Sequence, residues 1–228
     1  MAWAAHTATT IPTATDLPRT AIPTVMGIPT VTHITTGTGT ATITRLVTAT
    51  ATTMTMTTAD PHLTLHQLFS PAFPVGAFAY SHGLETCVQA GQVADAATLQ
   101  DWLETVLEHG AGWSDAVLMA QAAQGGDLHA LAELALALSP SHERRRETEL
   151  QGAALASTVS EVWGLSIPPL PYPVAMGRAV NLLDLPLLPA LTLYLQAFAS
   201  NLTGAGVRLI PLGQTDGQRI IHALTPLC

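Results

Sequence analysis

Residues 186–207 read PLLPALTLYLQAFASNLTGAGV, a stretch of 22 residues without a charged side chain. Apolar residues would occupy nearly every side of a helix formed by this stretch, and such a helix is either central in a fold or shared with another subunit. Proline is accepted in the first turn of a helix, so Pro186 does not oppose this reading. We therefore predict a long central helix from Pro186 to about Val207.

Helical patterns also precede this stretch. Asp95 is a plausible N-cap for a helix that ends near Gly110, and Ser141 can cap another that begins at His142. Further helices are expected over residues 127–138 and 174–183, with a proline-rich loop over residues 167–173. No strand pattern of comparable length occurs, so the sequence predicts an all-α fold, a compact bundle of about seven to nine helices.

The segment that begins at Ser141 carries two further expectations. Arg144, Arg145 and Arg146 alternate with glutamates, which is typical of a solvated helix face with i,i+4 ion pairs, although such a face can also belong to a partner interface. The side chains expected to point toward the core are Leu150, Ala154, Val159 and Trp163.

Composition changes abruptly near residue 58. Residues 1–58 alternate threonine with small residues, and the prolines among them argue against a strand. We interpret residues 1–58 as a low-complexity leader that is disordered, an O-glycosylated stalk, or a stretch outside the natural protein, with Met54 or Met56 as the true start. Residues 59–228 are expected to form the helical domain.

The charge balance excludes several classes of function. The 228 residues include no lysine, and eight arginines face sixteen carboxylates, for a formal net charge of −8. Such a chain is poorly suited to nucleic acid. We find no secretory signal and no apolar run long enough for a membrane span, and two cysteines without CxxC spacing fit a reducing compartment. A cytoplasmic protein is expected.

The first motif is SPAFPVGAFAYSHGLE at residues 70–85. Its prolines and Gly76 should shape a turn, after which Tyr80, Ser81, His82 and Glu85 should open a helix. A hydrolase built on Ser81, His82 and Glu85 is disfavoured, because adjacent helical residues point about 100° apart. We therefore predict no catalytic residues here.

The second motif is ASNLTGAGVRLIPLGQTDGQR at residues 199–219. Gly204 and Gly206 permit close packing, and Thr215 or Asp216 can cap the helix that follows. The polar residues Gln214, Thr215, Asp216, Gln218 and Arg219 either satisfy helix ends or present a docking surface. No phosphate-binding GxxxxGK[ST] loop occurs.

His62 and His66 have the i,i+4 spacing that puts two imidazoles on one helix face. No third ligand is near them in the sequence, so we predict no tight metal site. A histidine-based nickel carrier is the alternative function, because imidazole suits that ion.

The two motifs together resemble the UreF family of urease accessory proteins. The segment at residues 70–85 resembles the family's opening, and YPVAMGRAV at residues 172–180 followed by YLQAFASNLTGAGVRLIPLGQTDGQR resembles its closing half. The resemblance covers about residues 62–226. Family members usually continue further, so residues 59–228 are expected to be a UreF-like domain shortened at the C-terminus.

This resemblance implies an all-α, homodimeric, non-enzymatic scaffold. It implies binding to UreD (also called UreH) and UreG in a complex that inserts nickel into apo-urease. GTP would be bound by UreG and nickel handled by the complex, with no tightly bound cofactor on this chain. The partner-binding residues it implies are Tyr80, His82, Glu85, Arg208, Gln214, Asp216 and Arg219.

Overall fold

The computed structural model describes residues 60–76 and 81–228. Contacts divide the chain into Met1–Thr53 and Met54–Cys228, and all described residues belong to the second unit. The expectations for the leader over residues 1–58, and the placement of Tyr80, lie outside the described residues.

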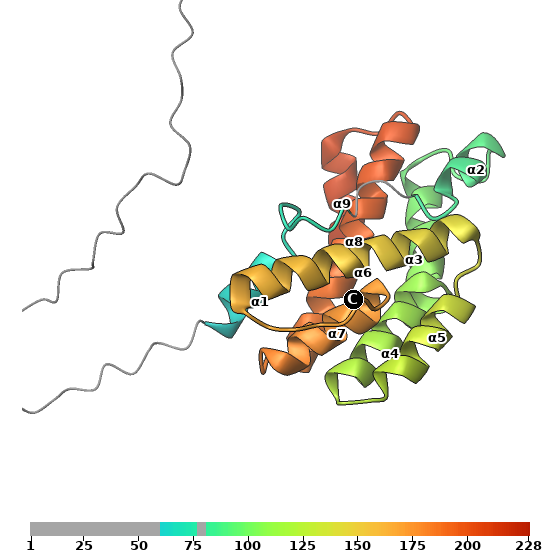
Figure 1. Ribbon diagram of the computed structural model, residues 1–228. Helices are drawn as coiled ribbons and strands as arrows, with labels where there is room; N and C mark the ends of the chain where they lie inside the picture. The colour runs from blue at the N-terminus through green and yellow to red at the C-terminus, as the bar shows by residue number, and fades with distance from the viewer. Residues whose placement is uncertain (1–59, 77–80) are drawn as a thin grey trace, which may run out of the picture. The chain divides into compact units, whose positions relative to one another are not determined.

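The described residues form nine helices and no strand, which confirms the all-α prediction (Figure 1). The helices are α1 (Pro61–Leu68), α2 (Leu84–Gln89), α3 (Ala96–His109), α4 (Ala111–Ala123), α5 (Leu128–Ala137), α6 (His142–Trp163), α7 (Tyr172–Leu182), α8 (Leu187–Leu209) and α9 (Gln214–Leu224). The predicted central helix is α8, and α4 was not among the segments predicted individually.

Side chains cap two helices where the sequence predicted it. Asp95 accepts a hydrogen bond of 2.9 Å from the Thr98 amide at the start of α3. Ser141 accepts one of 3.1 Å from the Arg144 amide at the start of α6. Each bond satisfies an amide that has no partner within its helix.

The start of α9 differs from the prediction. The N-cap is Gly213 rather than Thr215 or Asp216, and the Asp216 carboxylate accepts a hydrogen bond of 3.3 Å from the Gly213 amide. Asp216, in the first turn of α9, therefore supplies a hydrogen-bond acceptor for the Gly213 amide. Its negative charge is also stabilised there by the positive end of the helix dipole.

The proline-rich loop ends before residue 173. Helix α7 begins at Tyr172 and holds Pro173 in its first turn, where the missing amide proton costs no intrahelical bond. Thr148 on α6 fixes this start, because its hydroxyl accepts a hydrogen bond of 3.0 Å from the Tyr172 amide.

Two hydrophobic cores share helix α8. The first core contains Ala190 and Tyr194 of α8 together with residues of α1, α4, α6 and α7. The second contains Ala199, Leu202 and Ala205 of α8 together with residues of α2, α3 and α9. One continuous helix therefore supplies a wall to each core, which explains why its sequence is apolar on nearly every side.

The predicted buried face of α6 is confirmed at Val159 and is wrong at Leu150. Trp163 packs against the first core, as predicted. Leu150 is 53 % exposed, whereas Leu155 and Val159 are fully buried. Gly152 faces the backbone of Leu170, and a Cβ on it would collide with the Leu170 carbonyl oxygen. This close approach sets the rotation of α6 and turns Leu150 outward.

Gly206 confirms the predicted close packing at the end of α8. A Cβ there would lie 2.5 Å from a Leu99 side-chain carbon, so α3 and α8 approach where glycine makes room. Gly204 has no such neighbour, since only the Arg208 side chain would come within 4 Å of its Cβ.

Among the described residues, no helix combines the length and hydropathy that crossing a membrane requires.

Candidate functional site

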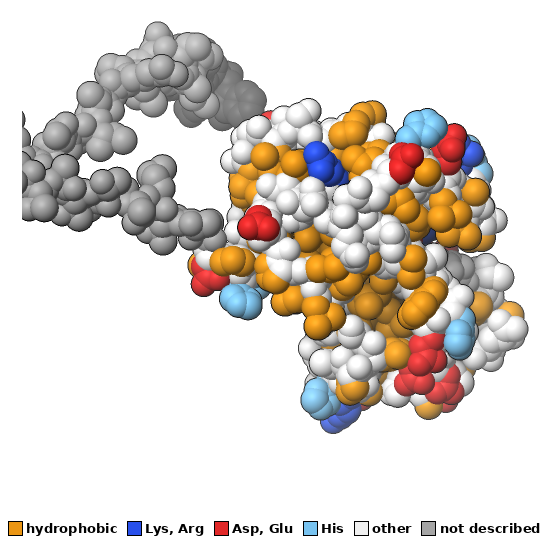
Figure 2. Space-filling model, turned by 90° about the horizontal axis from the view of Figure 1, so that it is seen from below, with side chains coloured by type: hydrophobic (Ala, Val, Ile, Leu, Met, Phe, Trp, Pro, Cys, Tyr) orange, Lys and Arg blue, Asp and Glu red, His pale blue; other side chains and the backbone are white. Residues whose placement is uncertain are grey.

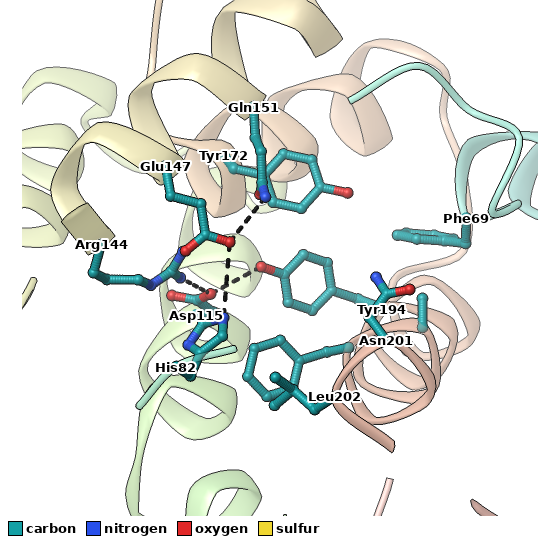
Figure 3. A pocket seen from close by; sticks show the side chains of 12 residues that line it. Phe69, His82, Asp115, Arg144, Glu147, Gln151, Tyr172, Tyr194, Asn201 and Leu202 are labelled. Atoms are coloured by element: carbon teal, nitrogen blue, oxygen red, sulfur yellow. Dashed lines mark hydrogen bonds and ion pairs between the residues drawn. The ribbon is translucent and has the colours of Figure 1, made fainter. Parts of the chain in front are cut away.

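A cluster of polar side chains lines a cavity (Figure 3). Helix α4 contributes Asp115, α8 contributes Tyr194, and the turn before α2 contributes His82. The α6 members are Arg144, Glu147 and Gln151. Buried polar groups are costly unless they are paired, so the hydrogen bonds of this cluster determine whether these helices can pack as they do.

Arg144 is the centre of the cluster. Its Nη2 donates to Asp115 Oδ2 at 2.6 Å, and its Nη1 donates to Glu147 Oε2 at 3.1 Å. Tyr194 Oη donates to the same Asp115 oxygen at 3.0 Å, and Gln151 Nε2 donates to Glu147 Oε1 at 2.9 Å. These bonds connect α4, α6 and α8 in one network.

The prediction for the arginine triplet is therefore wrong for one of its members. The Arg144 side chain is only 12 % exposed and pairs with a carboxylate on another helix. Arg145 behaves as predicted, since it makes an exposed i,i+4 pair with Glu149 at 3.4 Å. The difference follows from helical spacing, because residue 144 shares its face with Glu147 and Gln151 rather than with the solvent-facing residue 145.

His82 closes the cluster on the side of the turn. Its backbone has φ of 55°, a left-handed conformation that is uncommon for residues other than glycine. Its ring lies edge-on to Phe198 of α8 with centroids 5.0 Å apart, and its Nε2 lies 3.8 Å from Glu147 Oε1. Tertiary contacts on α6 and α8 thus accompany an unfavourable backbone conformation.

Burial shifts the pKa of the titratable groups in this cluster. It lowers the pKa of His82 from 6.5 to about 4, with the Arg144 charge as a second cause, so the imidazole is neutral near pH 7. Burial raises the pKa of the Asp115 and Glu147 carboxyls, while Arg144 acts in the opposite direction on both. Burial also raises the pKa of the Tyr194 hydroxyl, which remains a hydrogen-bond donor.

Two cavities meet at the cluster. The inner cavity has a volume of about 50 Å³. It is lined by the cluster together with Phe69, Tyr172 and, on α8, Ala197, Phe198, Asn201 and Leu202. The outer cavity has a volume of about 610 Å³ and lies between the turn before α2, the junction of α3 and α4, and the start of α6. His82, Arg144 and Glu147 line both cavities.

The structure separates the sequence-predicted partner-binding residues into two regions. Glu85 is exposed in the first turn of α2, whereas the His82 side chain is 11 % exposed and points into the cluster. The other region is the end of α8 and the start of α9, where Arg208, Gln214 and Arg219 are exposed. Asp216 is half-buried and also pairs with Arg219 at 2.6 Å.

The expectation that Ser81 and His82 open a helix is wrong. Ser81 and His82 lie in a turn, and α2 begins at Leu84. The angular argument against a hydrolase therefore does not apply, but the geometry supplies another. Within the described part of the chain no hydrogen bond joins the Ser81 and His82 side chains, and the His82 ring faces Glu147 and Phe198 instead.

His62 and His66 are both exposed on α1. In residues 60–76 and 81–228, no group of three or more histidine, cysteine, aspartate or glutamate side chains is arranged to hold a metal ion. Cys87 and Cys228 are free thiols that pack against the second core.

The residues that the sequence analysis missed are Asp115, Glu147, Gln151, Tyr172 and Tyr194. One signal for Asp115 was available. It is the only charged residue of the 13-residue helix α4, whose other residues are mostly apolar, and a lone carboxylate in such a helix requires a buried partner. The identity of that partner, 29 residues away, cannot be inferred from spacing.

Comparisons with known proteins agree with the resemblance seen in the motifs. A family model described as UreF matches residues 93–225. A urease accessory protein UreF of Ruegeria pomeroyi is 52% identical over 178 residues, covering 77% of this chain and 82% of that protein. One of Cereibacter sphaeroides (strain KD131) is 56% identical over 165 residues, covering 72% and 79%.

A third relative, the urease accessory protein UreF of Roseobacter denitrificans, is 49% identical over 172 residues, covering 75% of this chain and 78% of the relative. The family model covers more than half of the chain, and each of these alignments spans more than three quarters of the relative. The chain belongs to the UreF family.

Proposed function

We propose that this chain is a urease accessory protein that acts in the maturation of urease by nickel insertion. The observation that carries the proposal is identity of about 50% over about four fifths of relatives named urease accessory protein UreF. In this proposal the chain is a non-enzymatic scaffold, active as a homodimer, that binds UreD and UreG and presents them to apo-urease. GTP is bound by UreG and nickel is handled by the complex.

The surface supports a scaffold. Large apolar side chains are exposed on several helices, including Trp113 at 63 %, Leu138 at 52 % and Leu188 at 74 %. Figure 2 shows hydrophobic side chains spread across one face with charged side chains mainly toward its margins. Apolar surface with little charge is typical of regions that other proteins cover.

The proposed docking residues lie in the two accessible regions described above. Glu85 marks the first, and Arg208, Gln214, Asp216 and Arg219 mark the second. Tyr80 remains part of the proposal from its place in the motif.

GTP hydrolysis on UreG would change which assembly is favoured, because a nucleotide shifts an equilibrium only through differential affinity. The free thiols Cys87 and Cys228 support the cytoplasm as the compartment.

The test is activation of urease in cells that lack the gene for this chain. Supplying the chain should restore urease activity and the nickel content of purified urease without changing the amount of urease protein. Normal nickel loading in the deleted strain would overturn the proposal.

The docking residues are tested with Arg208→Glu and with a charge reversal of Asp216. Each should abolish co-purification with UreD or UreG while the helical circular dichroism signal is retained. Arg146→Glu is the matched control for Arg208→Glu, because Arg146 is also exposed but lies outside both regions. Unchanged co-purification of the Arg208 variant would remove that residue from the docking surface.

A further inference from the structure

The polar cluster forms a closed path that meets helix α8 twice. From Tyr194 on α8 it runs to Asp115 on α4, then to Arg144 and Glu147 on α6, and then to His82 in the turn before α2. The His82 ring returns to α8 through its edge contact with Phe198. Tyr194 and Phe198 are four residues apart, so they share one face of α8.

We propose that this path couples the position of α8 to the conformation of the turn at residues 81–83, and hence to α2 and Glu85. The coupling is a property of the chain itself, whereas its use in partner binding rests on the proposed function.

The turn depends on what holds His82. His82 and Gly83 both have positive φ, of 55° and 86°, and histidine adopts this conformation less readily than glycine. The ring lies between Glu147 Oε1, 3.8 Å from its Nε2, and the ring of Phe198. A change in either neighbour therefore removes support from a backbone conformation that residue 82 does not favour by itself.

The far end of α8 carries the other docking region. Arg208 lies in the last turn of α8, and α9 packs on the same helix at Gly217, where a Cβ would lie 3.0 Å from Val207 Cγ2. Arg208 lies 14 positions after Tyr194, a rise of about 21 Å along continuous helix at ~1.5 Å per residue. A partner that shifts this end of α8 would displace Tyr194 and Phe198 together.

Three amides report on the turn directly. The Leu84 amide donates to the Ser81 carbonyl at 3.0 Å, and the amides of Thr86 and Cys87 donate to the Gly83 carbonyl at 3.1 and 3.3 Å. Hydrogen exchange of these amides requires these bonds to open, so it measures how firmly the turn is held.

The experiment compares Tyr194→Phe with Tyr172→Phe in the full chain, by hydrogen exchange followed by nuclear magnetic resonance or mass spectrometry. Tyr194→Phe removes the hydroxyl that binds Asp115. Tyr172→Phe removes the hydroxyl of a ring 5.7 Å away, whose oxygen makes no hydrogen bond to a described residue. It therefore controls for loss of a tyrosine hydroxyl beside the same cluster.

We expect exchange at Leu84, Thr86 and Cys87 to rise about tenfold or more in Tyr194→Phe and less than about twofold in Tyr172→Phe. Exchange in the middle of α3, which lies outside the path, should stay the same in both. Unchanged exchange at the three amides in Tyr194→Phe, or an equal rise in Tyr172→Phe, would overturn the coupling.

His82→Asn provides a second test if Tyr194→Phe does not fold. Asparagine tolerates positive φ, but its shorter side chain cannot bridge Glu147 and Phe198. The same three amides should exchange faster in this variant while α3 is unaffected, and an unchanged rate would contradict the coupling. No partner protein enters either measurement, so failure of the proposed role in urease maturation would leave the result intact.

Discussion

Arg144 Nη2 on α6 lies 2.6 Å from Asp115 Oδ2 on α4, and both side chains are largely shielded from water, at 12 % and 8 % exposed. A buried ion pair of this kind contributes little to stability when compared with apolar residues that fill the same space. Its effect is greatest when one partner is lost, because the other charge then stays buried without compensation. The pair therefore fixes which α4 and α6 faces meet.

Removing Arg144 should be far more harmful than removing its neighbour. Arg144→Ala leaves Asp115 and Glu147 without their cation and should lower the free energy of unfolding by about 3–5 kcal/mol. Arg145→Ala breaks only an exposed pair and should cost about 0.5 kcal/mol or less. Urea denaturation of both variants measures the difference, and similar midpoints would contradict a structural role for the buried pair.

His82 should make stability fall in acid. Burial, with Arg144 as the second cause, lowers its pKa to about 4, below the 6.5 expected in the unfolded chain. The unfolded state therefore binds this proton more tightly. The contribution of neutral His82 to the free energy of unfolding is fully present above pH 6.5. It is lost as the pH falls toward 4, by at most about 3 kcal/mol.

The measurement is the free energy of unfolding of the wild type and His82→Gln between pH 7 and pH 4.5. The Asp115 and Glu147 carboxyls, whose pKa is raised by burial, act in the opposite direction but are present in both proteins. The two curves should therefore converge as the pH falls. Parallel curves would show that His82 does not titrate as its surroundings predict.

Two glycines offer a matched test of helix packing. Gly152→Ala places a methyl group against the Leu170 carbonyl oxygen and should destabilise the fold by about 1–3 kcal/mol or more. Gly204→Ala meets only the end of the Arg208 side chain and should be neutral or stabilising by up to about 1 kcal/mol. Thermal unfolding of the two variants decides, and equal melting temperatures would show that α6 can move away from Leu170 without cost.

Two leucines on α6 test which face is buried. Leu155→Ala, at a fully buried position, should cost about 2–5 kcal/mol. Leu150→Ala, at a position 53 % exposed, should cost about 1 kcal/mol or less. The reverse order in denaturant unfolding would support the predicted position of Leu150 in the core.

The helices could be predicted well because helix capping and hydrophobic periodicity depend on residues that are close in the sequence. Asp95 and Ser141 cap where they were expected to, and the apolar run from residue 186 became α8. The polar cluster was beyond these rules, because Asp115 meets Arg144 and Tyr194 across separations of 29 and 79 residues. The burial of Leu150 was predicted wrongly for a related reason, because the contact between Gly152 and the Leu170 backbone determines how α6 is rotated.

Helix α8 contributes residues to both cores, so unfolding of either core would remove packing contacts from the other. The helical unit should therefore melt cooperatively, in a single transition reported identically by fluorescence and circular dichroism. A chain break would be tolerated only away from that helix, for instance in the tight bend at residues 124–127. In a chimera of two relatives, α8 and the residues that pack against it in both cores would likewise have to come from the same parent.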